Sequence, residues 1–395
     1  MVRSRRCPRS EKPPHRSRAP TSGGVLFLLP PHPLDALCVR LGIVDSILDR
    51  LNRAIAEKVF PGAVVGVVEA NGRRQFYRAG HLTYQDDSPE VREDTIYDLA
   101  SVTKSIPGSC SLLKLIDEGG LKLEDRLVDF VPEFGNFENK KEVKIKHLLT
   151  YTLDLEILPT SKLKDKTAEE LLTVVVEAPL RSPPGIKYQY TNSTAGFVGL
   201  VVERVSGKKL DRYADENFFV PLAMNRTSYH PDLFDRTEIA PTEIDDWRGR
   251  VIQGEVHDES TFVLQRGGYI TAIAGLFSTA PDLLNFLAML LNQGSQAGRK
   301  YFSPEIVAQM STNQLDSANQ AKAGLGWVID WPEALGRYCS QRTFCKSGFT
   351  GTLVAVDPIK GIAFTLLSNR TYPKRPPDSS AINKVRRDIA DIVFK

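Results

Sequence analysis

The stretch Thr95–Lys104 reads TIYDLASVTK, and it contains the feature on which the prediction of the fold rests. Its first half, Thr95–Leu99, is typical of a short strand, and a helix is predicted to begin at Ser101. Residues three apart on a helix are neighbours, so the Lys104 amine is expected beside the Ser101 hydroxyl. We therefore predict that Ser101 is a nucleophile and that Lys104 helps to remove its proton.

The Ser-x-x-Lys spacing alone is not specific, because the chain contains it four times. The other copies begin at Ser111, Ser161 and Ser206. The first lies deeper in an apolar run, the second lies beside a lysine-rich segment, and the third ends a helix before a glycine. Only the copy at Ser101 opens a helix, where the positive end of the helix dipole lies. We predict structural roles for the other three.

A second candidate element is Tyr190-Thr191-Asn192, and none of the other tyrosines has asparagine two residues later. Residues two apart in an extended segment point to the same side. Tyr190 is suited to act as a base if nearby ammonium groups lower its pKa from the ordinary value of about 10. Asn192 is suited to orient Lys104 and a substrate carbonyl. The alternative is that Asn192 or Ser193 only caps the next helix.

A third candidate element is Lys346-Ser347-Gly348-Phe349, on a predicted strand near the C-terminus. Lys346 and Ser347 are suited to bind an anionic group of a substrate. Gly348 lets a substrate approach the strand closely. Alone, this sequence is also common on surface strands.

Strand patterns occur at both ends of the chain and predict one antiparallel sheet flanked by helices, an α+β arrangement. Near the N-terminus, a helical pattern over 44–57 precedes strands over 63–69 and 75–79 that are joined by the turn Asn71-Gly72. Near the C-terminus, strands are predicted over 326–331, 342–346, 353–356 and 362–367, and a final helix over 382–394.

The middle of the chain, about 105–300, is mostly helical in pattern, with predicted helices over 109–118, 168–177, 194–205 and 282–291. A long polar stretch over about 225–270 shows few helix signals, and such loops are often functional. We predict a catalytic domain over 44–395, with a sheet part (about 44–100 and 300–395) and a helical part (about 105–300). Residues 1–43 are predicted to be a disordered, proline-rich tail.

Composition and charge narrow the classes of function. The net charge is +3 and hydrophobic residues make up 42% of the chain. The first 40 residues hold eight basic and two acidic residues, so the remainder has a slight negative charge and gives no reason to expect a nucleic-acid partner. No apolar run reaches the roughly 18–20 residues of a membrane span. The short apolar patch at 25–29 does not resemble a signal peptide, which favours a cytoplasmic location.

The five cysteines predict reduced thiols, since their number is odd and no Cys-x-x-Cys occurs. Cys339 and Cys345 are near enough in sequence to pair, but free thiols are expected. The six histidines are scattered and predict no metal site. His257 is expected either to line the site or, more plainly, to belong to a structural loop. The absence of Gly-x-Ser-x-Gly argues against an α/β-hydrolase esterase.

The three elements together, in this order, resemble the serine β-lactamase and penicillin-binding-protein family in its class C-like branch. The resemblance runs from about Val44 to Lys395. It implies acylation of Ser101 and proton handling by Lys104 and Tyr190, without a metal or cofactor. It also implies an oxyanion site between the N–H groups of Ser101 and Phe349. The implied substrates are small esters, β-lactams or D-amino-acid peptides.

One departure keeps a different class of function open. Pro107 lies within the helix that should follow Ser101, removes a backbone hydrogen bond and predicts a kink that displaces Lys104. The alternative hypothesis is therefore a binding or assembly protein of the same fold with weakened catalysis.

Overall fold

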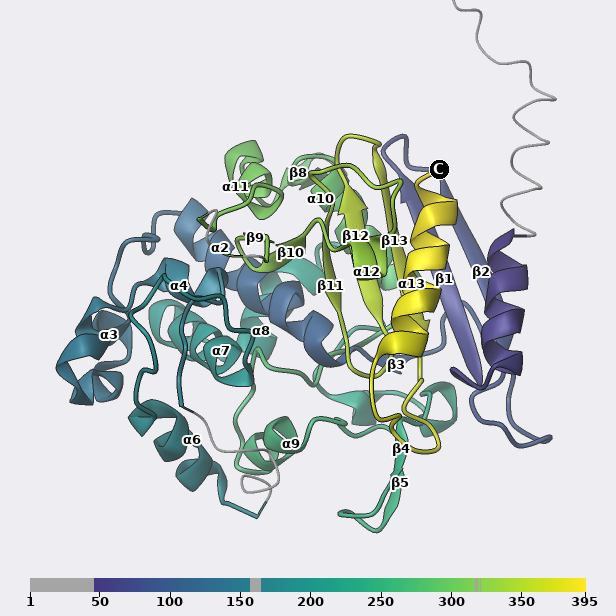
Figure 1. Cartoon of the computed structure of the whole chain (residues 1–395), viewed down its shortest axis with the longest axis horizontal. Helices are drawn as coiled ribbons and strands as arrows, with labels where there is room; N and C mark the ends of the chain where they lie inside the picture. Colours follow the sequence, from purple (N-terminus) through teal and green to yellow (C-terminus); the bar gives the residue numbers. More distant parts are fainter. Residues whose placement is uncertain (1–45, 157–164, 317–318, 320) are drawn as a thin grey trace, which may run out of the picture. The chain divides into compact units, whose positions relative to one another are not determined.

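The computed structural model describes residues 46–156, 165–316, 319 and 321–395. Its main feature is a seven-stranded antiparallel sheet in the order β2-β1-β13-β12-β11-β10-β9, which joins both ends of the described chain (Figure 1). The strands are β1 (Gly62–Glu69), β2 (Arg74–Gly80), β9 (Ala323–Gly324), β10 (Trp327–Ile329), β11 (Phe344–Ser347), β12 (Leu353–Asp357) and β13 (Ile362–Ser368). The predicted fold class is confirmed, since β1 from the N-terminal part pairs with β13 from the C-terminal part in one antiparallel sheet.

Side chains of β1 alternate between the two faces of the sheet, as the period of a strand requires. On one face Val65 packs with residues of the helical segment 46–56 and of α13 (Ser380–Val393). On the other face Val64 packs with residues of α10 (Ala280–Leu291). The sequence prediction placed α10 in the helical part of the chain, whereas in the structure α10 covers one face of the sheet.

Most of the remaining helices gather beside the sheet, whereas α12 (Pro332–Leu335) packs with α13 on the face that α13 covers (Figure 1). The others are α2 (Cys110–Asp117), α3 (Leu127–Phe130), α4 (Ile145–Leu149), α6 (Ala168–Glu177), α7 (Asn192–Ser206), α8 (Leu210–Ala214), α9 (Glu259–Arg266) and α11 (Pro304–Met310). The helix predicted over 168–177 has those bounds. None of the helices in the described part of the chain is long and apolar enough to cross a membrane.

The polar stretch 225–270 contains more regular structure than its sequence predicted. It includes the hairpin of β4 (Glu243–Asp245) and β5 (Arg250–Ile252), and then α9. Asp258 caps α9, because its side chain accepts a hydrogen bond from the Thr261 N–H. The prediction missed α9 because the helix is short and its polar residues carry little apolar periodicity. Cys110, Cys339 and Cys345 are free thiols.

Candidate active site

Ser101 and Lys104 share a 3₁₀-helix over Ala100–Lys104, and the Lys104 Nζ lies 2.9 Å from the Ser101 Oγ. The same Nζ donates to the Ile273 carbonyl at 2.8 Å. Lys104 is 1% exposed, and burial lowers its pKa to about 8, against a smaller opposing effect of Asp258. A buried amine of this kind is a candidate base at near-neutral pH.

The break at Pro107 does not displace Lys104. A π-helical turn covers Ser105–Ser109, and its non-helical residue is Ile106, with φ −113° and ψ 110°. The break therefore follows Lys104, and the predicted kink leaves the hydrogen bond between Lys104 and Ser101 in place.

The other Ser-x-x-Lys copies show no comparable arrangement where the structure describes them. Ser111 is fully buried in α2, and Lys114 forms an ion pair with Glu118. Ser206 accepts and donates backbone hydrogen bonds at the end of α7, while Lys209 donates to the Gly268 carbonyl. Ser161 and Lys164 lie outside the described residues.

Tyr190 lies between the two lysines of the site. Its ring centroid is 5.5 Å from the Lys104 Nζ and 4.2 Å from the Lys346 Nζ. Burial raises the pKa of Tyr190 above its ordinary value, and a hydrogen bond with Ser101 opposes this only in part. The condition on which a base role for Tyr190 depended, a lowered pKa, is therefore not met. Both amines face the ring, and burial lowers their own pKa values, which weakens their effect on the phenol.

Asn192 makes contacts other than the predicted ones. Its amide donates to the Asp258 Oδ2 at 3.1 Å and to the Ser260 Oγ at 3.4 Å. The capping residue of α7 is Thr191, whose side chain accepts from the Thr194 N–H, so neither Asn192 nor Ser193 is the cap. Asn192 thus reaches Lys104 only indirectly, through a neighbouring carboxylate.

That carboxylate, Asp258, is a residue that the sequence reasoning missed. Burial alone would raise its pKa, but the Lys104 charge and the hydrogen bonds from Ser260 and Thr261 outweigh this and lower the pKa. The sequence signal was the phrase Val256-His257-Asp258, of which only the histidine was considered as a site residue. Asp258 lies far from Lys104 in the sequence, and for this reason the interaction between their charges was not predicted.

Lys346 is 2% exposed at the end of β11, and its Nζ donates to the Tyr151 hydroxyl at 3.0 Å. It also lies over the Tyr151 ring, 4.5 Å from the centroid. Burial, and then the charge of Lys104, lower the pKa of Lys346 well below its ordinary value. Tyr151 was not predicted as a site residue. Its position beside Lys346 depends on the folded conformation of its loop, in which Tyr151 adopts a φ of 55°.

Gly348 lies against the backbone that leads into Ser101. A Cβ added at Gly348 would lie 2.3 Å from the Leu99 carbonyl oxygen and 2.1 Å from the Thr352 Oγ1. The close approach predicted for this glycine is therefore made by the protein's own backbone. It brings the loop after β11 beside the 3₁₀-helix that begins at Ala100.

A cavity of about 830 Å³ opens at Ser101. We call it the Ser101 cavity. Of the predicted site residues, Ser101, Tyr190, Lys346, Ser347, Gly348 and Phe349 line it, and Lys104 lies behind Ser101. Asn192 does not line it and borders a separate pocket of about 220 Å³. The rest of the lining is Tyr188, Ala321, Lys322, Val328, Ile329, Asp330, Trp331, Pro332, Glu333, Ser379, Asn383 and Arg386.

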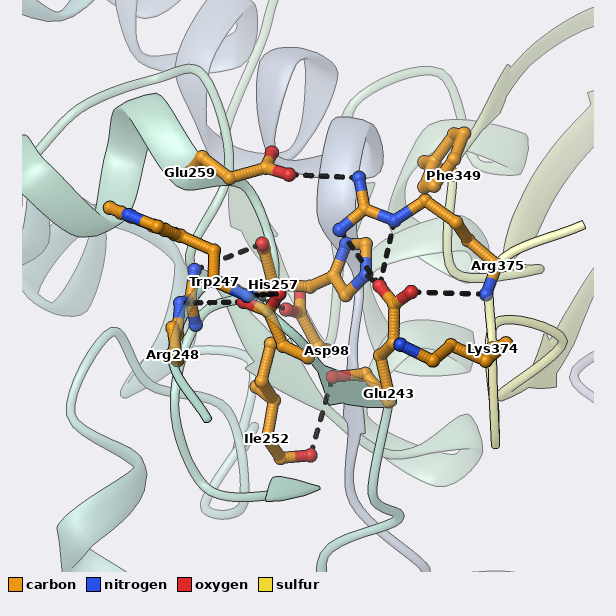
Figure 2. Close-up of polar contacts among 12 residues, drawn as sticks. Asp98, Glu243, Trp247, Arg248, Ile252, His257, Glu259, Phe349, Lys374 and Arg375 are labelled. Carbon is orange, nitrogen blue, oxygen red and sulfur yellow. Dashed lines mark hydrogen bonds and ion pairs between the residues drawn. The ribbon is translucent and has the colours of Figure 1, made fainter. Parts of the chain in front are cut away.

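His257 does not line the Ser101 cavity. It is 3% exposed, and Figure 2 shows its ring directed at Glu243 within a cluster of mostly polar residues. Within the described ranges, no group of three or more His, Cys, Asp or Glu side chains is arranged to hold a metal ion.

Comparison with known proteins places this geometry in context. The family model described as Beta-lactamase matches residues 47–387. A protein of Escherichia coli K12 that is named as a D-alanyl-D-alanine carboxypeptidase is 30% identical over 307 residues, which cover 70% of each chain.

Solved structures share the fold at lower identity. EstCE1, described as a hydrolase with promiscuous acyltransferase activity, matches with a TM-score of 0.73 and 20% identity, over 91% of this chain and 100% of its own. A penicillin-binding protein homologue from Pyrococcus abyssi matches with a TM-score of 0.65 and 23% identity, over 89% of this chain and 76% of its own.

Proposed function

This chain belongs to the β-lactamase family, whose members are serine hydrolases, and we propose that it hydrolyses esters or amides through an acyl-enzyme on Ser101. The observation that carries the proposal is the 2.9 Å hydrogen bond between the Lys104 Nζ and the Ser101 Oγ at the wall of the Ser101 cavity. Nucleophilic catalysis by serine requires such a base within hydrogen-bond reach.

In the acylation step, the Ser101 oxygen forms a bond to the substrate carbonyl carbon and passes its proton to the neutral Lys104 amine. Tyr190 keeps its proton at neutral pH, since the ordinary pKa of a phenol is already about 10, and is suited to protonate the leaving group. Collapse of the tetrahedral species breaks the bond to the leaving group. Once the leaving group has departed, Tyr190 regains its proton from the Lys104 ammonium. Water then bonds to the acyl carbon and gives a proton to the neutral Lys104 amine, and the Ser101 oxygen takes up that proton as its bond to the acyl carbon breaks.

The negative oxygen of the tetrahedral species needs hydrogen-bond donors fixed in advance. We assign this role to the backbone N–H groups of Ser101 and Phe349, which both border the Ser101 cavity. Lys346 and Ser347 are proposed to contact the substrate from β11. The name of the Escherichia coli relative favours D-alanyl peptides as one substrate class. Small esters are the second class that we propose.

A covalent probe tests the proposal. A fluorophosphonate should label the protein once, and peptide mass spectrometry should find the adduct on Ser101. Ser101→Ala should abolish both labelling and the hydrolysis of p-nitrophenyl acetate, while Ser206→Ala, at a copy of the same spacing outside the cavity, should change neither. An adduct on another serine, or full turnover by Ser101→Ala, would refute the proposal.

Proton transfer by Tyr190 has its own test. A positioned acid or base contributes roughly 10²–10⁴-fold in rate. Tyr190→Phe should therefore lower kcat by at least about a hundredfold while the thermal midpoint stays unchanged. A loss of only a few-fold would assign the proton transfer to Lys104 alone.

A further inference from the structure

The buried cluster in Figure 2 adjoins the Ser101 cavity, although most of its residues do not line it. At its centre, the His257 Nε2 lies 2.8 Å from the Glu243 Oε2, and both side chains are nearly fully buried. Hydrogen bonds and charge from His257 and Arg375 lower the pKa of Glu243 although burial opposes them. An ionised carboxylate only accepts hydrogen bonds, so the Nε2 of His257 carries the proton.

Glu243 is in turn held by Arg375. The Arg375 backbone N–H donates to the Glu243 Oε1 at 3.1 Å, and the Arg375 Nε donates to the Oε2 at 2.8 Å. The Arg375 Nη1 donates to Glu259 at 2.8 Å. The histidine ring therefore has an acceptor that is itself held by two hydrogen bonds from Arg375, and its orientation is restricted.

The face of the His257 ring stacks on Phe349. The ring centroids are 5.7 Å apart with an interplanar angle of 25°. Phe349 is 43% exposed at the wall of the Ser101 cavity, and its carbonyl accepts a hydrogen bond from the Arg370 Nε at 2.7 Å. The orientation of this half-exposed residue is thus set by buried neighbours.

Asp98 connects the same histidine to the other side of the site. One carboxylate oxygen accepts from the Ala100 N–H at 2.8 Å, and the other accepts from the His257 N–H at 2.7 Å. The Asp98 carbonyl accepts from the Thr350 Oγ1 at 2.7 Å. Ala100, which immediately precedes Ser101, has a φ of 46° that favours glycine, so this backbone needs such support.

We infer that His257, fixed by Glu243, is a positioning residue that sets the two backbone N–H groups of the oxyanion site. Its ring orients Phe349, and its backbone N–H holds Asp98, which holds the turn at Ala100. The inference rests on the proposed function, because it concerns the oxyanion of the same acylation step. A displacement of about 1 Å in such a site costs on the order of a hundredfold in rate.

The test compares a transition-state mimic with a substrate in the full-length chain. Phenylboronic acid forms a tetrahedral adduct with a serine and so reports on the oxyanion site, whereas KM for p-nitrophenyl acetate mainly reports other contacts. His257→Gln keeps a donor for Glu243 and the backbone N–H that bonds Asp98, but removes the ring. It therefore tests the contact of the ring with Phe349. We expect kcat/KM and boronate affinity to fall together by about ten- to a hundredfold, with KM nearly unchanged.

The matched control is His230→Gln. His230 also bonds a carboxylate, that of Asp211, at 2.8 Å, but it is half-exposed and does not line the Ser101 cavity. This variant should retain wild-type boronate affinity. A variant that is only less stable would lower the fraction of active protein without changing the affinity of the active fraction.

A second variant covers the case in which His257→Gln does not fold. Phe349→Leu keeps the backbone N–H and should also weaken boronate binding. In the double variant, the loss should be no greater than the larger single loss, because both act through one contact. Wild-type boronate affinity in Phe349→Leu, or losses that multiply, would overturn the inference. Absence of the Ser101 adduct in the wild-type protein would instead overturn the proposed function.

Discussion

At the scale of single residues, the two lysines of the site are both buried, and they differ in their partners. Lys104 contacts the Ser101 hydroxyl and a backbone carbonyl, whereas Lys346 contacts a phenol and two aromatic rings. In each case removal from water disfavours the ammonium form. This difference in contacts gives each lysine a separate test.

The pH dependence of hydrolysis tests Lys104. Its neutral form accepts the proton from Ser101, and this form becomes dominant as the pH rises through its pKa of about 8. We therefore expect kcat/KM for a neutral ester to increase about tenfold between pH 7 and pH 9, after subtraction of the rate of Ser101→Ala. A flat or falling profile over this range would contradict the assignment of Lys104 as the base.

Replacement of Lys346 by methionine tests its proposed contact with substrate. A charged anchor contributes about tenfold to a hundredfold more for an anionic substrate than for a neutral one. The amine is however bonded to Tyr151, and its pKa is lowered well below the ordinary value. We therefore expect Lys346→Met to lower kcat/KM by similar factors for matched neutral and carboxylate-bearing esters. If the loss were at least about tenfold larger for the anionic ester, Lys346 would be assigned as the anchor of the substrate carboxylate.

At the scale of elements, the site depends on how closely the end of β11 approaches the 3₁₀-helix of Ser101. Gly348 makes this approach possible, because a Cβ there would lie 2.3 Å from the Leu99 carbonyl oxygen. The Thr352 hydroxyl donates to the same carbonyl at 2.9 Å. The end of β11 and the segment that carries Ser101 are therefore held together by close backbone packing at Gly348 and by this side-chain hydrogen bond.

Gly348→Ala tests this approach. Overpacking against backbone that cannot move freely costs about 1–3 kcal/mol, so a lower unfolding midpoint in urea and a lower kcat are expected. Gly196→Ala in α7 is the control, since its added Cβ meets only the Ile273 side chain at an ordinary 3.7 Å. If the two variants were equally stable, the end of β11 and the 3₁₀-helix of Ser101 would be able to move apart without a loss in the free energy of unfolding.

At the scale of the whole molecule, the sheet unites residues from both ends of the described chain, and the family match begins at residue 47. We expect a chain that begins at Val44 to keep the thermal midpoint and the ester hydrolysis of the full chain. The physical reason is that residues 1–43 are basic and proline-rich, with little apolar surface to bury. A clear loss of either property would show that this segment contributes to the folded protein.

The sequence alone determined the fold class, because the β-branched run of β1 and the helical spacing in α6 are local patterns. It also indicated Ser101, Lys104 and Tyr190, through motifs whose order along the chain is informative. Short or polar elements such as α9 escaped this reasoning, since their sequences carry little periodicity.

Only the tertiary structure decided how these groups are charged and partnered. The carboxylate beside Lys104 lies 154 positions away, at Asp258, and the pKa of Tyr190 is raised where its neighbours in sequence gave no indication. Likewise, nothing local connects His257 with Glu243 and Phe349. Burial and long-range contacts set these properties, because desolvation and charge interactions depend on distance in space and not on separation along the chain.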